Sequence, residues 1–305
     1  MTDKINTYHI PVLLDACIEG LDIKYNGTYI DVTFGGGGHS RAIFEKLSPE
    51  GFLYVLDQDA DAKANAWSAP NFSFIQSNFS FLSNQMKAKG VMEVDGIIAD
   101  LGVSSHQFDQ PERGFSIRNE ADLDMRMNAS SQCTAADVLN TYDEEQLARI
   151  FRSYGEIKNA RRLAGEIVQN RTGSSIQTTK ELIDLLSGMA PKFKEHKYYA
   201  QVFQALRIEV NKELEALESF LAQAADLLKP GGRLVVMSYH SLEDRIVKNF
   251  MKKGNVKGQL EKDFYGNPLK PLTEVTRKPV VPDEIEQKEN TRSRSAKLRI
   301  AEKNG

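Results

Sequence analysis

Two aspartates stand on either side of a run of four glycines near the start of the chain. Asp31 lies in the short apolar stretch just before the glycines at 35–38, and Asp57 ends the next apolar stretch. Glycines let a backbone approach a ligand where side chains would clash. An acid at the end of the second strand of such a unit is placed to accept hydrogen bonds from ribose hydroxyls. The spacing therefore predicts that a nucleoside-containing ligand binds against the glycine run.

The patterns typical of dinucleotide and triphosphate sites are not met. The G-x-G-x-x-G pattern would need a glycine at Ser40 or Arg41, and a P-loop would need a lysine where this chain has His39. A carboxylate at Asp31 repels a pyrophosphate but suits a ligand that carries an ammonium and a sulfonium group. The residues therefore favour S-adenosylmethionine (SAM) as the cofactor. The alternative is a glycine-rich loop that binds no ligand.

These side chains need a parallel sheet to bring them together. The glycine run lies between two strands, at 29–34 and 52–56, with a short helix between them, which is a βαβ unit. A third strand is expected at 71–79 and a fourth at 94–101, with Asp100 at the tip of the fourth. Ligands of open α/β sheets bind at the carboxyl ends of the strands. One crevice is therefore expected to gather Asp31, Asp57, Phe79 and Asp100. Phe79 is placed either to stack on an adenine or to fill the core.

The middle of the chain changes character. Helical patterns with capping residues cover 134–140, 144–154, 157–171 and 179–190, and no strand pattern appears among them. A long helical pattern follows at 199–228, with a bend expected near Asn211, then a fifth strand at 233–239 and a late hairpin at 273–279 and 296–302. The prediction is an α/β fold with two domains. Residues 1–108 and 200–305 form the SAM-binding domain, and 109–199 form an all-α insertion for substrate recognition.

Composition sets the class of protein. An apolar content of 41% with 27% charged residues is ordinary for a globular protein. The sequence has no apolar run long enough for a membrane span and no signal-peptide pattern, and its two cysteines form neither a disulfide framework nor a zinc site alone. We therefore expect a cytoplasmic protein that contacts no membrane.

Charge is unevenly distributed along the chain. The net charge is −3, yet residues 245–305 carry 15 Lys and Arg against 8 Asp and Glu, a local excess of +7. Such a basic part suits contact with the phosphates of a nucleic acid. The alternative for this stretch is a solvated tail.

With these motifs in place, the chain resembles a known family. It is similar to class I SAM-dependent methyltransferases and, more narrowly, to the ribosomal RNA small subunit methyltransferase H family, the 16S rRNA cytosine-N4 methyltransferases. Gly36 and His106 depart from the family pattern, but neither removes a side chain that the chemistry needs. The stretches that carry the resemblance span nearly the whole chain: residues 9–15, Asp31-Val-Thr-Phe-Gly-Gly-Gly-Gly-His-Ser, Asp100-Leu-Gly-Val-Ser-Ser, Arg113-Gly-Phe-Ser, Leu123-Asp-Met-Arg-Met, Phe203-Gln-Ala-Leu-Arg-Ile, Ser238-Tyr-His-Ser-Leu-Glu-Asp-Arg and Arg292-Ser-Arg-Ser.

The resemblance implies a Rossmann-like fold with a helical insertion. It also implies methylation of a cytidine in the decoding region of 16S rRNA, with the small ribosomal subunit as partner. A homodimer is one option that the sequence leaves open. The SAM contacts that the resemblance implies are Gly37, Gly38, His39, Asp57, Phe79, Asp100 and Gln107, to which the residues themselves add Asp31.

Cytosine N4 is a poor nucleophile, so a group must accept its protons. Asp100 or a carbonyl of the following loop is expected to do so, with Ser104 and Ser105 orienting the base. Methylation at carbon 5 would need a cysteine nucleophile, and neither Cys17 nor Cys133 follows a strand tip. The reaction is therefore expected to be a direct in-line transfer without a covalent enzyme intermediate.

Several assignments remain open at the level of sequence. His240 either contacts RNA or simply caps a strand tip, and Arg113, Arg118 and Arg126 are candidates to grip RNA phosphates. No metal site is expected, because the acid pairs are only two residues apart. Two other functions are open: a non-catalytic RNA-binding assembly factor, and a methyltransferase that acts on protein or on a small molecule.

Overall fold

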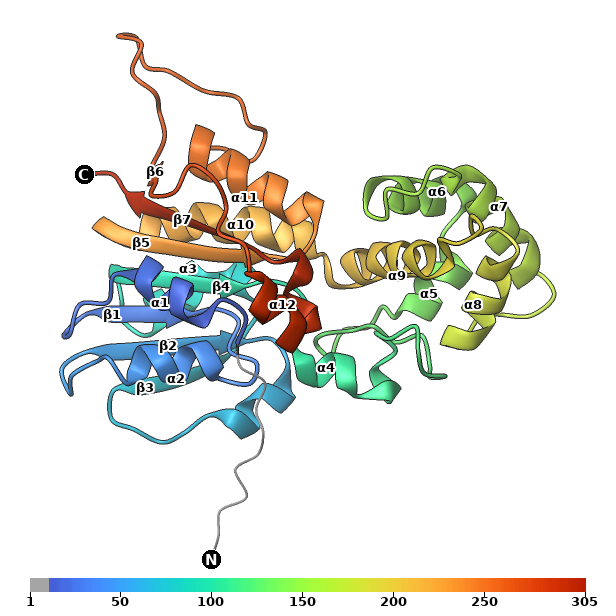
Figure 1. The fold of residues 1–305 in the computed structure, drawn as a ribbon, viewed down its shortest axis with the longest axis horizontal. Helices are drawn as coiled ribbons and strands as arrows, with labels where there is room; N and C mark the ends of the chain where they lie inside the picture. The colour runs from blue at the N-terminus through green and yellow to red at the C-terminus, as the bar shows by residue number, and fades with distance from the viewer. Residues whose placement is uncertain (1–10) are drawn as a thin grey trace, which may run out of the picture. The chain divides into compact units, whose positions relative to one another are not determined.

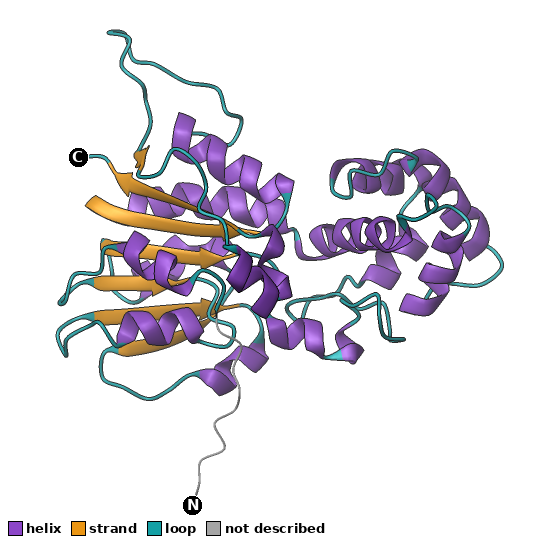
Figure 2. Ribbon diagram, in the orientation of Figure 1, coloured by secondary structure: helices purple, strands orange, loops and turns teal. Residues whose placement is uncertain are grey.

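The computed structural model describes residues 11–305, apart from the side chain of Ser105. His9 and Ile10 of the first resembling stretch lie outside the described residues. The chain divides into two compact units: the chain up to Gly102 together with Leu214–Gly305, and Val103–Glu213 between them. The sequence-based boundaries were 108/109 and 199/200. Figure 1 follows the chain through both units, and Figure 2 separates helices from strands.

The first unit is built on a seven-stranded sheet with the order β3-β2-β1-β4-β5-β7-β6. Neighbours from β3 to β5 run parallel, and the last two strands are antiparallel to the strands beside them. This is the predicted Rossmann-like sheet with its late edge hairpin. The strands are β1 (Thr28–Asp31), β2 (Phe52–Asp57), β3 (Phe72–Gln76), β4 (Val94–Asp100), β5 (Leu228–Ser238), β6 (Leu272–Glu274) and β7 (Lys297–Lys303).

Helices cover both faces of this sheet. Because side chains alternate along a strand, Tyr29 of β1 packs into one buried cluster and Ile30 into the other. The first cluster includes α1 (Leu14–Leu21) and α2 (Gly38–Phe44). The second includes α3 (Leu82–Ala88), α10 (Glu213–Leu227) and α11 (Ser241–Lys253). Cys17 lies fully buried in the α1 layer, as expected of a core residue.

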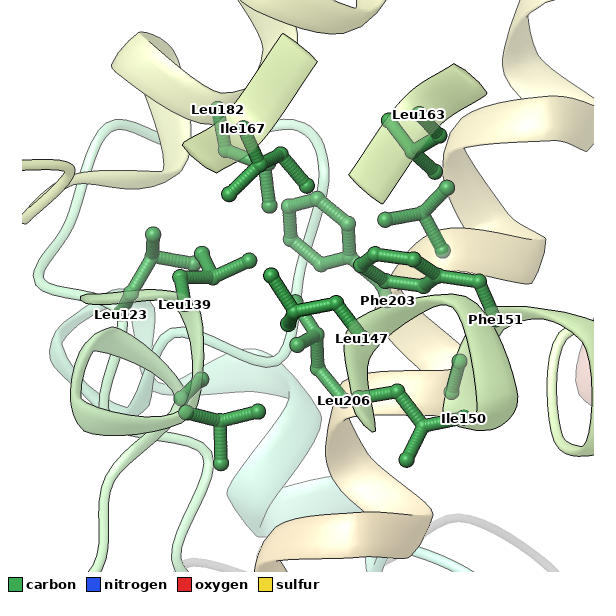
Figure 3. Packing of buried hydrophobic residues seen from close by; sticks show 14 of the residues in the cluster. Leu123, Leu139, Leu147, Ile150, Phe151, Leu163, Ile167, Leu182, Phe203 and Leu206 are labelled. Atoms are coloured by element: carbon green, nitrogen blue, oxygen red, sulfur yellow. The ribbon is translucent and has the colours of Figure 1, made fainter. Parts of the chain in front are cut away.

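The second unit is helical, with its own core (Figure 3). The prediction of helices here is confirmed; one isolated bridge, between Asp122 and Thr178, is described in this unit. The last helix, α9, supplies Val202, Phe203 and Leu206 to the core, and this packing explains why the unit extends past residue 199. The helices are α4 (Ser105–Asp109), α5 (Ala135–Thr141), α6 (Glu144–Ser153), α7 (Ala160–Arg171), α8 (Thr179–Ser187) and α9 (Glu195–Asn211).

Two sequence predictions were only partly right. The pattern at 199–228 is two helices rather than one bent helix, because Lys212 adopts a left-handed backbone (φ 50°) that ends α9. The strand predicted at 273–279 stops at Glu274, and Val280 makes only an isolated bridge to Leu298. Proline at 279 lacks the N–H that a continued ladder would need.

Candidate active site

Three aspartates end three neighbouring strands of the first unit. Asp31, Asp57 and Asp100 are the last residues of β1, β2 and β4, and β1 pairs in parallel with both of the others. Parallel strands present their carboxyl ends on one edge of the sheet. The structure therefore brings these three predicted residues together beside the glycine run.

The glycine run is shaped by hydrogen bonds to one of these acids. The N–H of Gly35 donates to Oδ2 of Asp57 at 2.7 Å. Gly37 has a left-handed backbone (φ 78°) and immediately precedes α2. A Cβ on Gly38 would lie 2.3 Å from Cγ of Pro11, so this position has no room for a side chain. Both positions therefore require glycine, Gly37 because of its backbone conformation and Gly38 because Pro11 packs against it.

Asp31 is used inside the protein. Its side chain is buried, with the residue only 2% exposed. Oδ2 accepts a hydrogen bond from Ser40 Oγ at 2.6 Å, and Oδ1 accepts one from the backbone N–H of Thr33 at 3.0 Å. Burial raises the pKa of this carboxyl, and the bond from Ser40 opposes the rise. We infer that Asp31 acts on a ligand indirectly, through the electrostatic field of its carboxylate and by holding α2 in place through Ser40.

Asp57 connects the loop to the second strand. Besides the bond from Gly35, its Oδ1 accepts a hydrogen bond from the N–H of Asp59 at 2.8 Å. Burial raises the pKa of Asp57 to about 6, and the two backbone bonds act against this rise. Each carboxylate oxygen retains a second lone pair. These lone pairs are free to accept bonds from the hydroxyls of a ribose.

Phe79 follows β3 and opens a short 3₁₀ turn, Phe79–Phe81. Its ring meets Phe220 of α10 edge-on, with 5.4 Å between the ring centroids. One part of the ring therefore packs on the core. The residue is only partly buried, so stacking on an adenine stays a prediction for it.

Asp100 lies in a small network with His39 and Tyr239. The hydroxyl of Tyr239 donates to Oδ1 of Asp100 at 2.8 Å, and Nδ1 of His39 lies 3.8 Å from Oδ2. Burial raises the pKa of Asp100 to about 6, while His39 and the Tyr239 bond pull it downward. The Asp100 side chain is still 26% exposed. It can therefore meet a ligand, and its pKa is close to neutrality.

Sequence reasoning missed Tyr239. The residue comes directly after β5, which pairs with β4, so its backbone emerges beside that of Asp100. The available signal was its place between the fifth strand and His240, combined with the rule that successive strand tips meet. The direction of its ring could not be read from the pattern.

His240 serves the local backbone. It precedes α11 as the N-cap, where its Nδ1 accepts a bond from the N–H of Glu243 at 3.4 Å. The Glu243 carboxylate in turn accepts a hydrogen bond from the N–H of Tyr239 at 2.9 Å. The structure shows His240 as the N-cap of α11 rather than as a cap on a strand tip, and contact with RNA stays a prediction. The capping pair also holds the turn that carries Tyr239.

Ser104 and Gln107 belong to the second unit, as does the backbone of Ser105, whose side chain lies outside the described part of the structure. Ser104 caps α4: its Oγ accepts a bond from the N–H of Gln107 at 3.2 Å, and Oε1 of Gln107 accepts one from the N–H of Ser104 at 3.1 Å. Gln107 is buried. A base-orienting role for the serines and a SAM contact for Gln107 stay predictions.

Two of the arginines considered for gripping RNA are bonded within the second unit. Nη2 of Arg113 donates to the carbonyls of Arg126 and Met127 at 2.9 and 3.1 Å. Arg126 makes two bonds to the carboxylate of Asp124, at 2.8 and 2.6 Å. Arg113 and Arg126 therefore organise the loop before α5. Arg118 is exposed.

The Tyr239 hydrogen bond gives a testable consequence for the neighbouring carboxyl. Tyr239→Phe removes a donor to Asp100 while keeping the ring, so the pKa of Asp100 should rise above about 6. A hydrogen bond to a charged group is worth about 1.5–3 kcal/mol, which corresponds to roughly one pH unit or more. A titration of the Asp100 carboxyl followed by ¹³C NMR should show its midpoint moved upward by this amount. A midpoint that stays in place would show that the Tyr239 hydroxyl does not act on Asp100.

Comparison with known proteins places this arrangement in context. A model of the MraW methylase family matches residues 6–304. A Bacteroides thetaiotaomicron protein named ribosomal RNA small subunit methyltransferase H is 56% identical over 297 residues, 97% of this chain and 98% of that one. A Bacteroides fragilis protein of the same name is 55% identical over 303 residues, 99% and 100% of the two chains. A third, from Cytophaga hutchinsonii, is 55% identical over 298 residues, 97% and 99% of the two chains.

Proposed function

The chain belongs to the MraW methylase family, and from this membership we propose that it methylates N4 of a cytidine in the decoding region of small-subunit (16S) rRNA, with SAM as donor. The observation that carries the proposal is the edge of the sheet, where Asp31, Asp57 and Asp100 lie around a glycine loop without side chains. The family membership and the acidic strand ends, which suit a cationic nucleoside, support the same cofactor.

The residues present fit SAM. Gly37 and Gly38 carry no side chain beside the strand tips, and the Asp57 carboxylate suits ribose hydroxyls. His39, Phe79 and Gln107 would complete the contacts, and the acids favour the positive sulfonium. When bound, SAM would supply an electrophilic methyl group: the amine attacks the methyl carbon in line, and S-adenosylhomocysteine leaves with the electrons of the broken S–C bond. The protein's main task is then to align donor and acceptor.

Asp100 is the residue placed to assist the amine. A cytosine must leave its stack to enter a crevice, and its N4 protons then need an acceptor. The Asp100 side chain is partly exposed, and its Oδ2 accepts one of these hydrogen bonds and takes the proton as the N–C bond forms, while Tyr239 donates to Oδ1. An acceptor with a pKa of about 6 is suited to this work near neutral pH. Ser104 and Ser105 orient the base.

A methyl-transfer assay tests the proposal. Purified chain, isolated small ribosomal subunits and tritiated SAM should yield label in 16S rRNA, recovered as N4-methylcytidine after digestion to nucleosides. Label in protein would instead favour a protein methyltransferase. An absence of label together with retained RNA binding would favour a non-catalytic assembly factor.

Two further aspects of the proposal concern setting and assembly. We place the protein in the cytoplasm, where its rRNA substrate is made. Within residues 11–305, no helix is both long and apolar enough to cross a bilayer. A homodimer is the proposed assembly. Light scattering of the purified chain would distinguish the dimer from a monomer.

A further inference from the structure

Two aromatic side chains stand fully in water at the end of one loop of the first unit. The loop at 254–271 joins α11 to β6 and runs outward at the top of Figure 1. At its tip Phe264 is 98% exposed and Tyr265 is 86% exposed. Their rings contact each other edge-on, with centroids 5.7 Å apart. Apolar rings in such a position contribute little to the core, so their presence calls for another explanation.

The tip is an ordered turn rather than a slack loop. The carboxylate of Asp263 accepts hydrogen bonds from the N–H groups of Tyr265 and Asn267 at 2.9 and 2.8 Å, and from the Asn267 side chain at 2.9 Å. The N–H of Gly266 donates to the carbonyl of Asp263 at 3.0 Å, and Lys262 and Pro268 pair in an antiparallel bridge. These bonds hold the two rings outward before any partner arrives.

The base of the loop is tied to the first unit. Asn249 of α11 donates to the carbonyl of Val256 at 3.1 Å, and Asn304, just after β7, donates to the carbonyl of Lys270 at 2.7 Å. The helix α11 begins at the end of β5 and runs for 13 residues, about 20 Å, before the loop starts. The tip therefore lies well away from the strand ends that carry Asp100.

The charge around the tip is positive. Residues 252–270 hold five lysines against two acidic residues, a net charge of +3 in a chain whose overall net charge is −3. Lysines attract a phosphate backbone, and exposed aromatic rings stack on unpaired bases in a way that tolerates any sequence. An acidic protein surface could also bind the lysines, but it would not account for the two exposed rings.

We propose that this aromatic tip, Phe264 and Tyr265, stacks on unpaired bases of the rRNA and anchors the substrate at a distance from the reacting cytidine. The inference rests on the proposed RNA substrate and adds a contact that is separate from the SAM crevice. Because the anchor binds substrate and transition state alike, its loss should raise KM without lowering kcat.

The test compares three variants of the full chain with wild type. Phe264→Ala/Tyr265→Ala removes both rings, and Phe264→Tyr/Tyr265→Phe keeps two rings at the tip. Tyr25→Ala removes a tyrosine of the first unit that is 68% exposed and follows Asp22 and Lys24, whose charges cancel. The measurements are the Kd for a fluorescein-labelled single-stranded RNA and for its duplex, KM and kcat with small subunits, affinity for SAM, and Tm.

The double alanine variant should bind single-stranded RNA about tenfold more weakly for each base that loses its ring. Its KM should rise in parallel, while kcat, SAM affinity, duplex binding and Tm stay at wild-type values. The ring-swapped variant and Tyr25→Ala should behave as wild type.

Unchanged affinity of the double alanine variant for single-stranded RNA would overturn the inference. So would a loss of subunit binding without a loss of RNA binding, which would assign the tip to a protein, or a change in oligomeric mass, which would assign it to a second copy. A failure of the proposed function looks different: wild type would leave no label in RNA, whatever the tip does.

Discussion

Replacing Asp100 with asparagine is expected to lower kcat by about 10²–10⁴-fold, the usual contribution of a positioned acid–base group. Asparagine keeps the shape of the side chain and an oxygen that can face the Tyr239 hydroxyl. It cannot take a proton from the N4 amine. Single-turnover methyl transfer with small subunits measures the change directly, without a contribution from product release.

The pH dependence of the same reaction gives an independent check. Asp100 has a pKa of about 6 and must be ionised to accept a proton, so the wild-type rate should fall as pH drops through about 6. This acidic limb should vanish in Asp100→Asn. Asparagine should also not weaken the fold at pH 7. Burial raises the pKa of Asp100 in the folded state from 3.8 to about 6. Protonation of Asp100 therefore stabilises the fold fully below pH 3.8, and this contribution is lost as the pH rises through about 6.

A variant rate within a few-fold of wild type would remove Asp100 from the chemistry. A low rate together with a low Tm would indicate damage to the strand end instead. Asp95→Asn is a useful comparison, because Asp95 lies on the same strand but bonds to Lys229 at 2.7 Å and has a lowered pKa. It should reduce stability and leave kcat unchanged.

The second large effect is expected at the cofactor. Asp57→Asn should weaken binding of S-adenosylhomocysteine, the demethylated product, by about 10- to 100-fold, because hydrogen bonds to a charged acceptor contribute about 1.5–3 kcal/mol. Asparagine also has only one side-chain oxygen, so it can accept a hydrogen bond from the N–H of Gly35 or of Asp59 but not from both with separate oxygens. Isothermal titration calorimetry with the product avoids turnover during the measurement.

The sign of the pH effect follows from the raised pKa. Ribose hydroxyls donate to the ionised carboxylate, so wild-type affinity should be full well above pH 6 and decline as pH falls through about 6. The dissociation constant of Asp57→Asn should be flat over this range. Asp59→Asn is the matched control, since that side chain accepts a bond from the N–H of Asp61 in the next turn. Equal losses in both variants would assign the effect to the loop as a whole.

The predictable part of the site is the part set by chain topology. Asp31, Asp57 and Asp100 were located from the sequence because each ends an apolar stretch, and parallel strands put such ends on one edge. Tyr239 was not found, since its role depends on the direction of one ring. The intramolecular bonds of Arg113 and Arg126 were not predicted for a related reason: their backbone and carboxylate partners are set by a loop fold that no periodicity encodes.

The fold was predicted with similar limits. The helical insertion and the edge hairpin follow from periodicity and capping residues. The end of α9 at Lys212 does not, because a left-handed lysine carries no signature of the kind that glycine gives. The predicted boundary at 199/200 falls inside α9, whereas the compact units divide after Glu213. The sequence of α9 shows which face of the helix is apolar but not which core that face packs against.

The separation of β4 from β5 along the chain matters during synthesis. β4 ends at Asp100, and its neighbour β5 does not begin until Leu228. At a translation rate of about 5–20 residues per second, this interval lasts roughly 6–25 s. Throughout it, an apolar strand has one open edge, a condition that invites pairing with other nascent chains. The insertion has a core of its own, so its helices can fold before β5 is made and pairs with that edge.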